Sequence, residues 1–300
     1  MPSPSPGQDS IQGHSPTPAS ESESDDHGSN ARARRTDTKP VFQGFRNGPR
    51  RLAYSAMPHR SLSLEEAARY LHLARQDVER LVRETDIPHD VLGGRIQFQR
   101  GALDAWASQR ILGMPGKRLD VYHEQSMRGT RDALPGAALI PELLRAEYID
   151  LGLPSKTRSS VMREMVGLAE KTGRVLDARE LLKSVEEREA MCPTALPGGL
   201  ALLHARNHAE YRFEGSFIVL GRTIQPIPFS APDGRSTRIF FLVCCEDDRL
   251  HLHTLARLCM IALKSDAISQ LFAAENRDAA YAALVEGENA VLPQPAEEPE

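Results

Sequence analysis

Three polar residues of the chain have types and spacings that suit the transfer of a phosphoryl group. His204 and His251 each lie in an apolar segment, and Arg188 precedes His204 by sixteen residues. A neutral imidazole near pH 7 has a free nitrogen lone pair, so it can attack phosphorus without a separate base. The group in transit spreads negative charge over three oxygens, which fixed cations or N–H donors must meet. Residues of these types could therefore take part in phosphoryl transfer where the fold brings them together.

Two other interpretations of the histidines stay open. His204 and His208 are spaced i, i+4, and His251 and His253 are spaced i, i+2, so each pair could supply metal ligands. No cysteine or carboxylate motif completes such a set, and we expect no metal and no cofactor. A histidine in an apolar run can also be a core residue, and we expect His208 and His253 to be structural or to face solvent.

The segments around these residues have the patterns of buried strands and helices. Residues 217–220 and 239–245 are uniform apolar runs, typical of strands buried on both faces, and Pro-Asp-Gly at 232–234 marks a turn between them. Residues 250–263 have a helical pattern. The inward positions are Leu255, Leu258 and Ala262 in that segment, and Val161, Met165 and Leu168 in an earlier one. Mixed strands and helices predict an α/β layered domain over residues 137–287.

The motifs of this region agree with a known family. They are Ser-Lys-Thr-Arg at 155–158, Leu-Leu-His-Ala-Arg at 202–206, Ile-Pro-Phe at 227–229, Asp-Gly at 233–234, Phe-Phe-Leu at 240–242 and His-Leu-His at 251–253. In these motifs the region resembles the type-2 EIIA domain of the sugar phosphotransferase system, an α/β domain with a mixed sheet.

The resemblance implies a role for each residue. His204 would accept phosphate from a phosphorylated histidine carrier protein, and His251 would hydrogen-bond the phosphoryl group. Arg188 would neutralise its charge, and backbone N–H groups near residues 196–199 would add donors.

A smaller module precedes this domain, at residues 61–110. Ser63 and Glu66 form a capping box, and Gly93-Gly94 fits a two-residue hairpin. Two apolar stripes predict short helices, and a closing helix follows the hairpin. The stripes are Leu64, Ala67, Ala68 and Leu71, then Val78, Leu81 and Val82, and the closing helix carries Leu103 and Trp106. The module resembles the excisionase- or MerR-like winged helix-turn-helix family.

This second resemblance implies DNA binding, with the second helix in the major groove and the hairpin as a wing. The positions that would face DNA are Arg75, Gln76, Glu79, Arg80 and Arg83 on the helix, and Arg95 on the wing. Arginine and glutamine side chains suit guanine and adenine edges. The alternative is a fold that has been kept as a protein-contact module.

The whole chain sets limits on the partners. Its 300 residues hold 37 Lys and Arg against 41 Asp and Glu, for a net charge of −4, so a DNA contact must come from a local patch. None of the 4 cysteines forms a C-x-x-C pair, which favours buried thiols in a reducing cytoplasm. We expect no signal peptide and no membrane span.

The composition predicts where the domains begin and end. We expect a disordered tail at residues 1–58, a linker at 111–135 and a polar tail at 288–300. The two modules together predict a cytoplasmic DNA-binding regulatory protein whose EIIA-like domain is a histidine phosphoacceptor. The alternatives are a phosphate-carrying EIIA component of sugar transport, and an interaction or scaffold protein that needs no phosphate.

Overall fold

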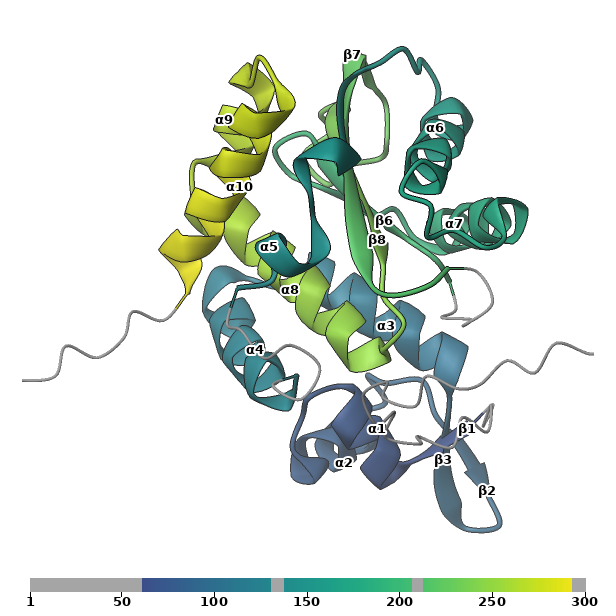
Figure 1. Cartoon of the computed structure of the whole chain (residues 1–300). Helices are drawn as coiled ribbons and strands as arrows, with labels where there is room; N and C mark the ends of the chain where they lie inside the picture. The colour runs from purple at the N-terminus through teal and green to yellow at the C-terminus, as the bar shows by residue number, and fades with distance from the viewer. Residues whose placement is uncertain (1–60, 131–137, 207–212, 293–300) are drawn as a thin grey trace, which may run out of the picture. The chain divides into compact units, whose positions relative to one another are not determined.

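The computed structural model describes residues 61–130, 138–206 and 213–292 (Figure 1). The expected disordered tail at 1–58 and His208 lie outside the described residues, as does the end of the expected C-terminal tail. None of the helices in the described ranges is long and apolar enough to cross a membrane.

The first described helices form the predicted helix-turn-helix pair. Helix α1 (Leu64–Tyr70) begins at Ser63, whose side chain and that of Glu66 form the expected capping box. Helix α2 (Arg75–Arg83) buries Val78 and Leu81 against α1. The apolar stripes therefore lie where their helical spacing predicts.

A small antiparallel sheet accompanies the helices. Strands β1 (Ser61–Ser63), β2 (Asp90–Leu92) and β3 (Arg95–Gln99) have the order β1-β3-β2. Gly93 and Gly94 join β2 to β3 with φ angles of +58° and +76°. Both angles lie in the left-handed region, which favours glycine, so the predicted wing hairpin forms.

Two longer helices follow the hairpin. Helix α3 (Arg100–Leu112) is the predicted closing helix, and α4 (Gly116–Gly129) occupies most of the segment where we expected a linker. The linker expectation failed because the buried side chains of α4 are Leu119, Tyr122, His123 and Ser126, of which two are polar. An inward stripe of that composition has weak apolar periodicity.

The second part of the chain is built on a five-stranded mixed sheet. Its strands are β4 (Ile149–Leu153), β5 (Ala195–Leu196), β6 (Leu200–His204), β7 (Phe217–Ile227) and β8 (Thr237–Cys244), in the order β4-β7-β8-β6-β5. Strands β6 and β8 are parallel, whereas β7 and β8 are antiparallel. Every residue of β6 is buried, as its uniform apolar composition predicts.

Helices cover both faces of this sheet. Helices α6 (Arg158–Glu170) and α7 (Ala178–Met191) lie on one side, and α10 (Arg277–Val291) lies on the other, with α5 (Ile140–Leu143) and α9 (Ala267–Ala273) near it (Figure 1).

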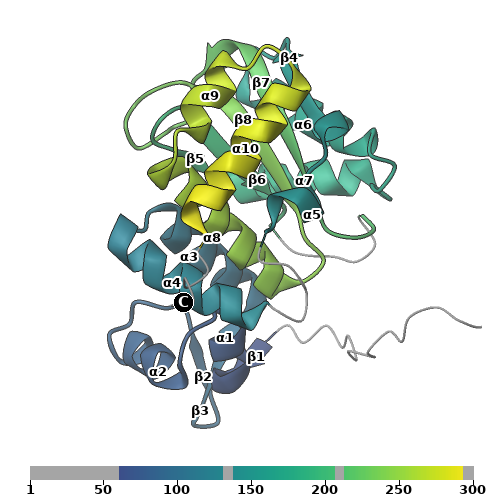
Figure 2. The ribbon, with the colours of Figure 1, turned by 60° about the vertical axis from the view of Figure 1, so that its left-hand side comes forward.

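Helix α8 (Asp248–Lys264) packs against β8 and α10 and also against α3 and α4 (Figure 2). Because it has neighbours on opposite sides, all its residues from Leu250 to Ile261 are buried.

The beginning of the expected polar tail belongs to the core. Glu288 lies in α10, is 1% exposed and forms a buried ion pair with Arg257 of α8. Its carboxylate also accepts hydrogen bonds from the backbone N–H groups of Leu139 and Ile140, at 2.7 and 2.8 Å. The charged composition of this segment predicted a solvated tail. That prediction was wrong for Glu288, because its carboxylate is paired with the buried Arg257.

Candidate functional site

The two predicted site histidines meet at the carboxyl edge of the parallel strands. His204 is the last residue of β6 and pairs with Val243 of β8. After β8 the chain turns into α8, and His251 lies in the first turn of that helix. Strand ends of a parallel pair share one edge, which explains why residues so far apart in sequence come together. The two ring centroids are 4.9 Å apart, with 53° between the ring planes.

Arg188 reaches the same place from α7. The helix buries Leu181, Ser184, Val185 and Arg188, which are spaced i, i+3, i+4 and i+7 and so form one inward stripe. Arg188 is 0% exposed, and each nitrogen of its guanidinium donates a hydrogen bond. Nε donates to Nε2 of His204 at 3.0 Å, Nη1 to the carbonyl of Cys192 at 2.9 Å, and Nη2 to Oγ of Ser108 at 2.9 Å.

The hydrogen-bond partners of His204 determine which of its ring nitrogens carries the proton. Nδ1 lies 2.8 Å from the carbonyl oxygen of Leu202, and a carbonyl can only accept, so Nδ1 carries a proton. Nε2 accepts from the guanidinium of Arg188 and therefore keeps its lone pair. The imidazole is neutral, and its nucleophilic nitrogen points at a fixed cation.

The surroundings of Arg188 balance its charge in part. Burial lowers the pKa of Arg188, and the carboxylate of Asp104 counters that shift. The pKa of Glu189 is raised by burial, although its carboxylate accepts hydrogen bonds from the backbone and hydroxyl of Thr194. A buried guanidinium beside a neutral imidazole can bind the oxygens of a phosphoryl group.

Two residues of the site escaped the sequence analysis, and both come from α3. Ser108 accepts from Arg188, and Asp104 accepts from the hydroxyl of Tyr70 at 2.6 Å. They are spaced i, i+4 on the inward stripe of α3 and are 0% and 3% exposed. Two polar residues on an otherwise apolar stripe are a signal that could have found them.

The expected backbone donors near residues 196–199 do not belong to this site. Gly199 precedes His204 by five residues along β6, roughly 16 Å of extended chain at about 3.3 Å per residue. The N–H of Gly198 instead donates to the carboxylate of Asp233 at 2.9 Å. The prediction was wrong because the turn lies at the amino end of β6, whereas the histidines lie at its carboxyl end.

A second buried histidine cluster lies where α4 packs on α8. Nε2 of His123 accepts from Nε of Arg257 at 2.6 Å, and Nδ1 of His253 lies 2.9 Å from Oγ of Ser126. Burial lowers the pKa of His123 to about 4 and that of His253 to about 2, and the charge of Arg257 acts in the same direction. His253 is thus a structural residue. Among the described residues, no three His, Cys, Asp or Glu side chains are grouped so that they could hold a metal ion.

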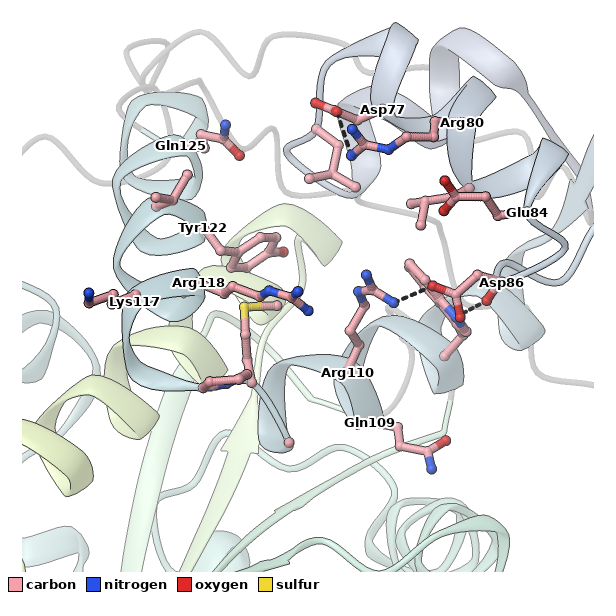
Figure 3. A pocket seen from close by; sticks show the side chains of 17 residues that line it. Asp77, Arg80, Glu84, Asp86, Gln109, Arg110, Lys117, Arg118, Tyr122 and Gln125 are labelled. Atoms are coloured by element: carbon pink, nitrogen blue, oxygen red, sulfur yellow. Dashed lines mark hydrogen bonds and ion pairs between the residues drawn. The ribbon is translucent and has the colours of Figure 1, made fainter.

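The arginine and glutamine residues expected to face DNA are all exposed, whereas Glu79 is partly buried. Gln76, Arg83 and Arg95 are exposed, and Arg75 is exposed while paired with Glu65 at 2.5 Å and Glu79 at 2.9 Å. Arg80 is exposed to the same degree as Arg75, pairs with Asp77 at 2.9 Å, and lines a cleft of about 1190 Å³ between α2, α3 and α4 (Figure 3).

Comparison with known proteins identifies two regions. Residues 142–287 match the family described as phosphoenolpyruvate-dependent sugar phosphotransferase system, EIIA 2, and residues 61–111 match the helix-turn-helix domain family. Over 142 residues, 47% of the chain, the sequence is 28% identical to the fructose-specific EIIABC component of Bacillus subtilis, of which the match covers 22%. It is 27% identical over the same length to the fructose-specific EIIA component of Haloferax volcanii, of which it covers 90%.

Solved structures match about half of the chain. The nitrogen regulatory protein IIA-Ntr from Neisseria meningitidis is 23% identical, with a TM-score of 0.45 over 49% of this chain and 99% of that one. The mannitol IIA of Escherichia coli is 20% identical, with a TM-score of 0.42 over 47% and 98%.

Proposed function

We propose that this chain, which joins a helix-turn-helix domain to a type-2 EIIA domain, is a DNA-binding regulator that accepts a phosphoryl group on His204. The donor is the phosphorylated histidine of a carrier protein of the phosphotransferase system. The observation that carries this proposal is the 3.0 Å contact between Nε of Arg188 and Nε2 of His204, beside the ring of His251. A fixed cation at a neutral imidazole is what phosphoryl transfer requires.

The transfer step uses the lone pair on Nε2 of His204. That nitrogen attacks the phosphorus, the P–N bond of the donor breaks, and its electron pair returns to the donor imidazole. Nδ1 of His204 keeps its proton, which the carbonyl of Leu202 holds throughout. Arg188, His251 and the amino end of α8 stabilise the negative charge on the transferred oxygens. His204 thus acts as a phosphate carrier.

The helix-turn-helix domain supplies the DNA contact. We place it in the excisionase- or MerR-like group, with α2 in the major groove and the β2–β3 hairpin as the wing. Gln76, Arg83 and Arg95 are exposed and would make the contacts. Arg75 and Arg80 are exposed but paired with Glu79 and Asp77, and would support them. Buried free thiols at Cys244, Cys245 and Cys259 favour a reducing cytoplasm as its location.

Burial of the histidines favours a second candidate function. His204 and His251 are both 0% exposed, as in a core whose polar residues are satisfied internally. The chain would then be an interaction protein in which both folds persist without phosphate chemistry. A sugar-transport component, the role that the names of the relatives give, would instead pass the phosphoryl group to an EIIB partner.

The test is phosphorylation of the full chain. The protein is incubated with enzyme I, the histidine carrier protein and phosphoenolpyruvate, and intact mass is measured before and after acid treatment. We expect one acid-labile phosphate that His204→Gln removes and that His89→Gln, a histidine of the other domain, retains. Absence of phosphate in the wild type, with a donor active on another EIIA, would favour the interaction protein.

A further inference from the structure

We propose that α3 of the helix-turn-helix domain occupies the surface on which the phosphoryl donor must dock, so that α3 and the donor bind there alternately. The inference deepens the proposed function and rests on it for the identity of the donor. Its basis is the contact that α3 makes with the acceptor site, and the charges that lie on the two sides of that contact.

The first observation is that α3 closes the site. His204, His251 and Arg188 are each 0% exposed, and α3 packs directly on α8, the helix that carries His251. Ser108 of α3 bonds the same guanidinium that bonds Nε2 of His204. A donor phosphohistidine must bring its phosphorus to Nε2 within bond-forming distance. Because the site has no exposed surface, a covering element must move first.

The second observation is a competition for the charge of Arg188. In the unphosphorylated chain the guanidinium donates to the hydroxyl of Ser108, and the carboxylate of Asp104 balances its charge. A phosphoryl group on Nε2 brings close to two negative charges to the same guanidinium. It would attract Arg188 and repel the buried carboxylate of Asp104. Phosphorylation therefore favours the state in which α3 has left the site.

The third observation is that the anchors of this contact lie at the start of α8. Arg100 of α3 forms an ion pair with Asp248, and the ring of His72 lies 2.9 Å from the carbonyl of Arg249. Asp104 in turn holds the hydroxyl of Tyr70 in α1. Movement of α3 would therefore also displace α1 and α2, the helix pair that contacts DNA. Arg100 takes part in none of the three hydrogen bonds of the Arg188 guanidinium, so it can be changed while the acceptor residues themselves stay the same.

The experiment compares two arginines of α3 in the full-length protein. Arg100→Ala breaks the ion pair to α8, and Arg110→Ala breaks an ion pair to Asp86 inside the helix-turn-helix domain. Both arginine side chains are 40% exposed, so the variants are matched. The first readout is the initial rate of phosphorylation at limiting carrier protein. The second is the rate at which diethyl pyrocarbonate modifies His204, followed by peptide mass spectrometry.

We expect Arg100→Ala to raise both rates about fivefold to tenfold, the change expected when a half-buried ion pair is lost. Arg110→Ala should leave both rates at the wild-type value. Arg100→Gln removes the same ion pair with a polar side chain and should behave like Arg100→Ala, which guards against a folding defect in one variant. Phosphorylated wild type should also exchange the amide hydrogens of α3 faster than unphosphorylated protein.

The outcomes separate the two proposals. Equal rates in wild type, Arg100→Ala and Arg100→Gln, by both readouts, would show that α3 does not cover the acceptor site and would leave the phosphoacceptor proposal intact. Faster modification of His204 in these variants, with no phosphate on any of them, would support the proposal that α3 covers the site. It would overturn the proposal that His204 accepts phosphate.

Discussion

Arg188 connects the acceptor histidine to the rest of the molecule. Its three hydrogen bonds leave in different directions, to His204, to the end of α7 and to α3. The resemblance to the type-2 EIIA family brought Arg188, His204 and His251 together in the sequence analysis, and the structure places them in one cluster. Ser108 and Asp104 were missed because they belong to another module, and no pattern within that module indicates which surface its inward stripe meets.

The first prediction follows from the geometry of the guanidinium. Arg188→Lys keeps the charge but cannot donate to three acceptors in a planar fork. We expect phosphorylation of His204 to slow by roughly 10²-fold, the loss typical for one preorganised donor in a catalytic site. The measurement is the initial rate with saturating carrier protein, with Arg179→Lys on the exposed side of α7 as the control. A rate within twofold of wild type would show that the fork has no part in transfer.

At the scale of elements, the periodicity of apolar residues and the positions of capping and turn residues predicted most of the helices and strands. The capping box at Ser63, the glycine pair at Gly93 and the apolar run of β8 all form the structures expected from local chemistry. Helix α4 was missed because its inward stripe mixes apolar with polar residues, each of which finds a buried partner on α8. Such partners lie far away in sequence, so a local pattern cannot reveal them.

The second prediction concerns α2 and the wing. Arg83→Ala and Arg95→Ala should each weaken DNA binding and reduce the dependence of affinity on salt by about one ion per lost phosphate contact. Arg80→Ala should have a smaller effect, because Arg80 lines the cleft and pairs with Asp77. Binding to a DNA fragment is titrated at several salt concentrations, with Arg118→Ala on α4 as the control. Equal losses for Arg80 and Arg83 would place the DNA-binding face differently.

At the scale of the molecule, the helix-turn-helix part and the α/β part share one packed boundary at α8. The sequence suggested two modules joined by a linker, since each half has its own apolar stripes. The boundary contains charged and polar residues that local patterns assign to a surface: Arg100, His123, Asp248 and Arg257. Composition and the periodicity of apolar residues do not specify how buried polar groups that are far apart in sequence pair with one another.

The third prediction is a pH dependence of this boundary. His123 has a folded-state pKa of about 4, against about 6.5 for an unfolded chain, so the unfolded state binds more protons between these values. Stability is therefore complete above about pH 6.5 and falls as the pH is lowered towards 4. His123 alone should account for a loss on the order of 2 kcal/mol between pH 7 and pH 5, and His253, whose pKa is lowered to about 2, should add a comparable loss.

Urea unfolding at the two pH values measures this loss, and His123→Gln should reduce it by removing the titrating ring. A pH dependence as steep in His123→Gln as in the wild type would assign it to other groups.

The most direct measurement is of the nitrogen that carries the phosphate. Nuclear magnetic resonance of the ¹⁵N-labelled imidazoles, before and after phosphorylation by the carrier protein, distinguishes Nδ1 from Nε2 in each histidine. The hydrogen bonds of His204 predict a proton on Nδ1 in both states and phosphorus on Nε2 after transfer. Phosphorus on Nδ1 of His204, or on another histidine, would contradict this account of the site.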